Sequence, residues 1–109
     1  MPDPAHDLFW SLAAELALDD PRVREGTILG GRCLRVGDAF LALVDRKGQG
    51  LVVKLDRARV AELIAAGVGE PFAPAGRTFR EWVAVRSPDA DGWRALLREA
   101  VLFNAGGQP

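Results

Sequence analysis

Residue types that build reactive sites are scarce in this sequence. It has no tyrosine, one cysteine (Cys33), one histidine (His6) and two serines (Ser11 and Ser87). A single cysteine excludes an internal disulfide framework, and a zinc site normally needs about four closely spaced ligands. Neither serine lies in the turn that presents a nucleophile, and the Gly-Lys-Ser/Thr end of a phosphate-binding loop is missing. We therefore expect no enzyme, no bound metal and no cofactor.

Long apolar runs are also missing. No run approaches the roughly 20 apolar residues that a membrane-spanning helix requires, and the start MPDPAHDLF lacks the basic residues and apolar stretch of a secretion signal. The 109 residues are 49% hydrophobic and 27% charged, which is the composition of a folded domain rather than of a disordered chain. We expect a single domain over residues 1–109 that is cytoplasmic and makes no membrane contact.

The spacing of the apolar residues predicts three helices. Leucines recur every four residues near the N-terminus, and similar apolar stripes lie in the middle and near the C-terminus. Asp56 is placed to cap the middle helix and Gly67 to end it. Arg94 and Arg98 fall outside the apolar stripe of the last helix, so we expect both to face solvent. The predicted helices cover residues 4–18 with Asp3 as cap, residues 57–66, and the segment from Ser87 or Asp89 to the Gly106-Gly107 pair.

Between the first two helices the apolar period changes to two, which is typical of strands. The pair Gly37-Asp38 predicts a tight hairpin within this region. The run AFLALV, residues 39–44, is apolar on both faces, so we expect a central strand that is covered on both sides. A further strand, EWVAVR at residues 81–86, follows the middle helix. The expected fold is α+β: one mainly antiparallel sheet, a meander plus one later strand, with an N-terminal, a middle and a C-terminal helix packed on it.

Basic residues are concentrated in one region of a chain whose net charge is only −1. Residues 21–59 hold nine Lys or Arg side chains and four Asp or Glu side chains. Residues 1–20 hold no Lys or Arg. If these side chains share one face of a sheet, they would form a basic stripe that contacts the phosphates of a nucleic-acid backbone. Only Phe40 lies among them as an aromatic for base stacking, and charged residues also protect edge strands from aggregation. The candidate nucleic-acid contacts are Arg22, Arg24, Arg32, Arg35 and Lys54.

The stretch GEPFAPAGRTFREW, residues 69–82, combines turn-forming residues with three aromatic side chains. One interpretation is a packed corner, in which the aromatic side chains cover the core and the arginines pair with Glu70 and Glu81. The other is the lip of a pocket for an anionic or planar ligand, or for a partner protein. For this second interpretation the candidate contacts are Arg77, Arg80 and Trp82.

Most of the chain resembles the TfoX N-terminal-domain-like proteins and the neighbouring MmcQ/YjbR-like group. The resemblance lies in the run GGRCLRVGDAFLALVDRKGQGLVVKLDRARVAELIAAGVGEPFAPAGRTFREWVAV, followed by WRALLREAVLF. The shared features are a glycine pair before a strand, the hairpin VGDAFLALV, LVVKL leading into a helix, and GEPFAPAGRTFREWV. The resemblance covers residues 8–104 and implies an α+β domain of small bacterial proteins. It links TfoX-type members to competence regulation and YjbR-like members to DNA binding, and it supplies no catalytic residues.

These observations predict a non-catalytic binding or regulatory domain, with nucleic acid as its leading candidate partner. One alternative is a protein-interaction or self-associating module, such as a homodimer. The other is a domain that binds a small anionic ligand at residues 69–82.

Overall fold

The computed structural model describes residues 4–28, 31–45, 50–73 and 76–106. Along the chain the elements are α1 (Pro4–Asp19), β1 (Val23–Ile28), β2 (Gly31–Val36), β3 (Ala39–Asp45), β4 (Gly50–Lys54), α2 (Arg57–Ala65), β5 (Glu70–Phe72), β6 (Phe79–Val85) and α3 (Ala90–Gly106). The strands form one six-stranded sheet in the order β1-β2-β3-β4-β6-β5, and every neighbouring pair is antiparallel. The predicted α+β class, with one mainly antiparallel sheet and three helices, is confirmed. Over the described ranges, no helix combines the length and the apolar character that crossing a membrane would need.

The helix boundaries follow from local sequence signals. The side-chain carboxylate of Asp56 accepts a hydrogen bond of 3.0 Å from the backbone N–H of Ala58, so the predicted cap of α2 is confirmed. Gly67 follows α2 with φ of 77°, the left-handed conformation that glycine tolerates at little cost. α1 begins at Pro4, a position that suits proline because the first helical N–H has no partner within the helix. The expected cap of α1, Asp3, lies outside the described residues.

The short strand β5 was not predicted from the sequence. It pairs with β6 at the edge of the sheet, where Glu70 faces Ala84 and Pro71 faces Val83. Proline lacks a backbone N–H and is therefore tolerated in sheets mainly at such edges. Residues 69–82 thus contain an edge strand and the start of β6 rather than a loop alone.

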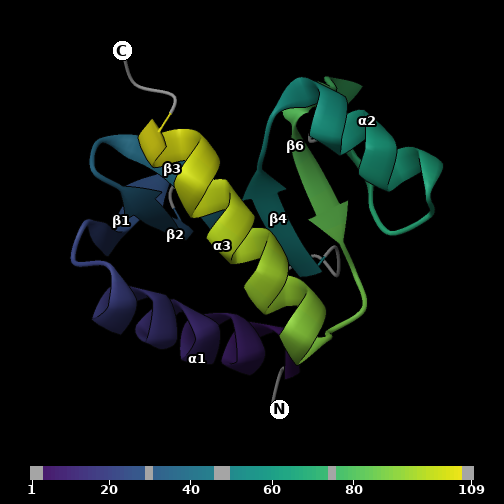
Figure 1. Ribbon diagram of the computed structural model, residues 1–109. Coiled ribbons are helices and arrows are strands. Elements are labelled where there is room, and N and C mark those ends of the chain that lie inside the picture. The colour runs from purple at the N-terminus through teal and green to yellow at the C-terminus, as the bar shows by residue number, and fades with distance from the viewer. Residues whose placement is uncertain (1–3, 29–30, 46–49, 74–75, 107–109) are drawn as a thin grey trace.

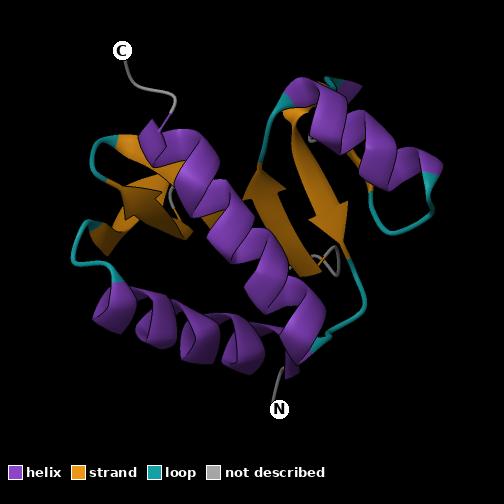
Figure 2. Ribbon diagram, viewed as in Figure 1, coloured by secondary structure: helices purple, strands orange, loops and turns teal. Residues whose placement is uncertain are grey.

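The three helices pack on one face of the sheet (Figures 1 and 2). α3 crosses the middle of the sheet, with α1 beside it and α2 next to β6 (Figure 1). The main core joins buried side chains of all three helices, such as Phe9, Leu63 and Trp93, to alternate residues of the strands, such as Val53 and Val83. This face therefore holds most of the apolar area that folding removes from water.

The opposite face of the sheet has a smaller apolar cluster of its own. Val52, Phe72 and Ala84 are buried there, with Leu43 and Trp82 packed against them. No residue of a described helix belongs to this cluster. We therefore call this side of the sheet the helix-free face. The prediction that the central strand is covered on both sides therefore needs correction. Helices cover one side, and on the other side the apolar cluster formed by described residues consists of strand side chains.

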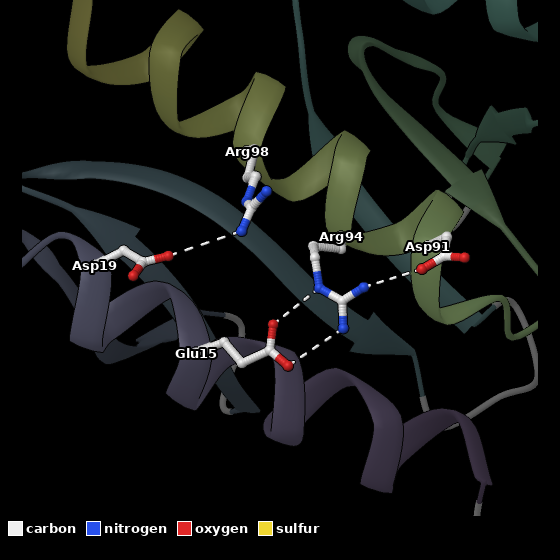
Figure 3. A network of polar contacts seen from close by, with 5 residues as sticks. All are labelled: Glu15, Asp19, Asp91, Arg94 and Arg98. Carbon is white, nitrogen blue, oxygen red and sulfur yellow. Dashed lines mark hydrogen bonds and ion pairs between the residues drawn. The ribbon is translucent and has the colours of Figure 1, made fainter.

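Arg94 and Arg98 join α3 to α1 (Figure 3). The guanidinium of Arg94 binds Glu15 on α1, and Arg98 Nη2 lies 3.8 Å from the carboxylate of Asp19. The prediction that both arginines simply face solvent is therefore wrong for Arg94, whose side chain is only 29% exposed. The apolar stripe of α3 faces the sheet, which turns the neighbouring flank of the helix toward α1.

Candidate functional site

The structure places three of the five candidate nucleic-acid contacts on the helix-free face. Leu34 and Val36 of β2 point into the main core, so Arg35 between them points to the other side. Arg24 lies directly opposite Arg35 in the neighbouring strand, and opposed residues share a face. Lys54 follows Val52 by two residues and therefore points the same way, beside its cross-strand neighbour Trp82.

Arg32 does not belong to this set. Its Nε donates a hydrogen bond of 2.6 Å to Glu25 Oε2, and its guanidinium carbon lies 4.0 Å from the centroid of the Trp10 ring on α1. The side chain therefore lies on the helix-covered side of the sheet, between a carboxylate and an aromatic ring.

Arg22 is also held by a neighbour, Asp20. Arg22 Nη2 donates to Asp20 Oδ2 at 2.7 Å, and Nε donates to Oδ1 of the same carboxylate at 3.0 Å. The hydrogen bonds from Arg22 lower the pKa of Asp20 to about 2, so the pair stays ionised near neutral pH. The predicted five-residue stripe is thus reduced to Arg24, Arg35 and Lys54.

Residues 69–82 form one wall of a cavity beside α2. The cavity has a volume of about 220 Å³, and its lining includes Val60 and Ile64 from α2 and Phe79, Arg80 and Trp82 from β6. The structure thus brings two of the predicted ligand contacts, Arg80 and Trp82, to one site. Phe72 is buried in contact with Trp82, as the packed-corner interpretation expects, whereas Phe79 keeps 38% of its surface exposed. The pocket-lip interpretation stays a prediction.

A second, more polar cavity adjoins the first. It has a volume of about 440 Å³, shares Arg57, Phe79, Arg80 and Trp82 with the apolar cavity, and adds Glu81. The third predicted contact, Arg77, lies nearby, with its guanidinium carbon 5.7 Å from the centroid of the Phe79 ring. Apolar surface and guanidinium groups therefore meet at the start of β6.

The basic side chains fall into two groups, those that form ion pairs with carboxylates and those that do not. Among the described residues, seven arginines lie within 4.0 Å of a carboxylate oxygen. These paired cations are Arg22, Arg24, Arg32, Arg59, Arg86, Arg94 and Arg98. Within the described part of the chain, the cations that form no ion pair are Arg35, Lys54, Arg57, Arg77 and Arg80.

Four of the unpaired cations surround two aromatic side chains. We call this surface the cationic corner, and it consists of Lys54, Arg57, Arg77, Arg80, Phe79 and Trp82. The predicted ion pairs of Arg77 and Arg80 with Glu70 and Glu81 are wrong, since none of them occurs among the described residues. Glu70 Oε2 instead lies 2.8 Å from Nε of Arg86, because the register of β5 against β6 places Glu70 opposite Ala84, two residues before Arg86.

Two members of the corner, Arg57 and Phe79, were not predicted as contacts. Arg57 is the first residue of α2, and only the packing of α2 beside β6 brings it to Arg80. The pairing of Lys54 with Trp82 was equally hidden, since 28 positions of sequence containing a whole helix separate β4 from this part of β6. The signal in the sequence that pointed to this surface was the mixture of aromatic and basic residues at positions 77–82.

Two observations in the described ranges concern metal binding and thiol chemistry. Among these residues, no group of three or more His, Cys, Asp or Glu side chains is placed to hold a metal ion. Cys33 on β2 is 1% exposed, and burial raises the pKa of its thiol above the ordinary value, so the reactive thiolate is disfavoured.

Comparison with protein-family models, with curated proteins and with solved structures finds no match to this chain. The resemblance to the TfoX-like and YjbR-like groups therefore stays a prediction, and any functional proposal depends on the cationic corner and the surfaces beside it.

Proposed function

We propose that this protein is a non-catalytic binding domain whose partner is anionic and contacts the cationic corner. The observation that carries the proposal is the division of charge. Carboxylates of the same chain hold arginines such as Arg32, Arg59 and Arg94. Among the described residues, Lys54, Arg57, Arg77 and Arg80 have no such partner. A cluster of unpaired cations creates a positive potential that attracts negatively charged partners.

The chemistry of the corner suits carboxylate or phosphate groups. A guanidinium presents several N–H donors in a planar fork that matches either anion, and such charge-assisted hydrogen bonds are stronger than neutral ones. Phe79 and Trp82 add ring faces and apolar surface to the same site. The net charge of −1 provides no general attraction for polyanions, so binding has to come from this local cluster.

Nucleic acid is the first partner to test. Single strands combine phosphates with bases that stack on aromatic rings and on guanidinium planes. Arg24 and Arg35 extend the cationic surface along the helix-free face, where the guanidinium carbon of Arg35 lies 5.1 Å from the centroid of the Phe40 ring. This proposal retains three of the five contacts that the sequence predicted.

The test is fluorescence anisotropy with labelled single- and double-stranded DNA and with an acidic peptide, at low and at physiological salt. The corner variant is Lys54→Ala with Arg80→Ala, and the matched control is Arg22→Ala with Arg98→Ala, which removes the same charge elsewhere. We expect salt-sensitive binding of at least one of these anions, weakened by the corner variant and not by the control. Equal weakening by both variants, or no binding of any anion at low salt, would refute the proposal.

A separate observation favours self-association as a second candidate function. Leu18 on α1 and Leu102 on α3 are 88% and 75% exposed, and a cavity of about 230 Å³ lined by Leu16, Val101 and Leu102 lies at this end of the two helices. Exposed apolar patches of this kind often mark protein interfaces. Sedimentation equilibrium should then give a mass above 11.7 kDa that falls in Leu102→Glu. A monomer at all accessible concentrations would exclude this candidate.

A further inference from the structure

The apolar cavity of the cationic corner has the form of a socket for one side chain. α2 supplies Val60 and Ile64 as one wall, and β6 supplies Phe79 and Trp82 as the other. The cavity of about 220 Å³ opens beside the larger polar cavity of about 440 Å³, and both are lined by Arg80. An apolar side chain in the apolar cavity would therefore place the neighbouring groups of its own chain next to guanidinium groups.

We propose that the cavity takes one apolar side chain of an acidic peptide segment, whose carboxylates bind Arg57, Arg77 and Arg80. This inference deepens the proposed function and rests on it, because it names the partner of the same anionic site. Apolar anchors that fill a small pocket, with charged contacts around them, carry most of the affinity in many protein interfaces. The corner has this arrangement: the cavity walls are apolar, and the cations around them form no ion pair within the described ranges. Glu81 also lines the polar cavity, but no described arginine or lysine is ion-paired with it.

A nucleobase fits the apolar cavity less well than a side chain does. Apart from arginines and the indole of Trp82, the described lining offers one polar side chain, the hydroxyl of Thr78. A base buried there would leave most of the donors and acceptors on its edges without partners, and burying such groups unpaired is costly. An aliphatic or aromatic side chain has no such groups to satisfy.

A second copy of this chain is also a poorer occupant. Its most acidic element is α1, but Glu15 and Asp19 on α1 are already bound by Arg94 and Arg98 of α3 (Figure 3). Carboxylates paired within their own chain offer little net charge to the corner of a neighbour. An acidic segment of a different protein brings carboxylates that still need partners.

The test uses short fluorescein-labelled peptides of Glu and Asp with one central residue, which is Phe, Leu, Trp or Ala. A fifth peptide keeps Phe and replaces the acids by Gln and Asn, and a labelled single-stranded oligonucleotide is measured in parallel. We expect the Phe, Leu or Trp peptide to bind at least about tenfold more tightly than the Ala peptide, since burying a large apolar side chain contributes that much. The Gln/Asn peptide should lose most of its affinity and its salt dependence.

Two protein variants connect this binding to the cavity. Ala61→Leu places a larger side chain at an exposed position of α2 that lines the cavity, and leucine is a good helix former, so the fold should be kept. We expect this variant to reduce the preference for Phe over Ala while leaving the salt dependence unchanged. Lys54→Ala with Arg80→Ala should weaken all acidic peptides, and Arg22→Ala with Arg98→Ala should weaken none.

The outcomes separate this inference from the proposed function. If the Ala peptide binds as tightly as the Phe peptide, or if Ala61→Leu has no effect, the socket is excluded while an anionic site at the corner stands. If the oligonucleotide binds and no peptide does, the acidic peptide is excluded as the partner, while the proposal of an anion-binding site at the corner stands. If neither probe binds at low salt, both proposals fail.

Discussion

Arg94 on α3 binds Glu15 on α1 through two parallel hydrogen bonds (Figure 3). Arg94 Nε donates to Oε2 at 2.9 Å and Nη2 donates to Oε1 at 3.2 Å. The two residues are 79 positions apart, so this contact ties together the first and last helices on the covered face of the sheet. The same guanidinium reaches Asp91 within α3, where Nη1 lies 3.1 Å from Oδ1.

We expect Glu15→Gln to lower the melting temperature near neutral pH. The substitution removes the charge that the planar fork of Arg94 binds at two points, which is the strongest geometry for such a pair. Asp91→Asn is the matched control, because Asp91 is 97% exposed and lies only three residues from Arg94 on the same helix. Thermal unfolding followed by circular dichroism should show a clear shift for the first variant and little for the second.

The stabilisation by Glu15 should depend on pH in a defined direction. The hydrogen bond from Arg94 lowers the pKa of Glu15 below its ordinary value of 4.5. Because the folded-state pKa is depressed, the contribution is complete above pH 4.5 and is lost as the pH falls below that value. The difference in melting temperature between the wild type and Glu15→Gln should therefore shrink in acid. A difference that stays constant down to the lowest pH would contradict this assignment.

Gly50 should be far less replaceable than Gly37, although both have positive φ. At Gly50, with φ of 70°, an added Cβ would lie 2.5 Å from the carbonyl oxygen of Val85 and 2.8 Å from that of Arg86. At Gly37, with φ of 58°, nothing lies within 4 Å. Gly37→Ala should cost about 1–2 kcal/mol for the left-handed backbone alone, and Gly50→Ala clearly more. Urea unfolding of the two variants checks this, and equal costs would contradict it.

Arg32→Ala should affect stability rather than binding. Its guanidinium is held by Glu25 and lies against the ring of Trp10 on α1, whereas the cationic corner lies where α2 meets β6. We expect a lower melting temperature and an unchanged affinity for anionic probes. Arg80→Ala should give the reverse pattern, and the same two measurements on both variants distinguish the two roles. Weaker anion binding by Arg32→Ala would mean that the original basic stripe is wider than the structure indicates.

Cys33 should react slowly with thiol reagents in the folded protein. Its side chain is 1% exposed, and burial raises the pKa of the thiol, so both access and thiolate content are low. Labelling should become fast and complete in denaturant. Rapid labelling of the native protein would show that the central strands open readily around β2.

Local signals in the sequence determined much of the fold. The leucine spacing of α1, the cap at Asp56, the glycine at Gly67 and the change of period to two each depend on residues a few positions apart, and each is confirmed. These features arise from local backbone preferences and side-chain periodicity, so they can be predicted without tertiary information. The α+β class follows from their order along the chain.

Only the tertiary structure decided which charges are free. Sequence proximity grouped Arg22 and Arg32 with Lys54, but Asp20 and Glu25 bind the first two, and Lys54 lies beside Trp82 instead. Strand pairing and helix packing bring together residues that are distant in the chain, and a one-residue step along a strand changes the face on which a side chain lies. The cationic corner therefore exists because α2, β4 and β6 meet, and no single stretch of sequence contains it.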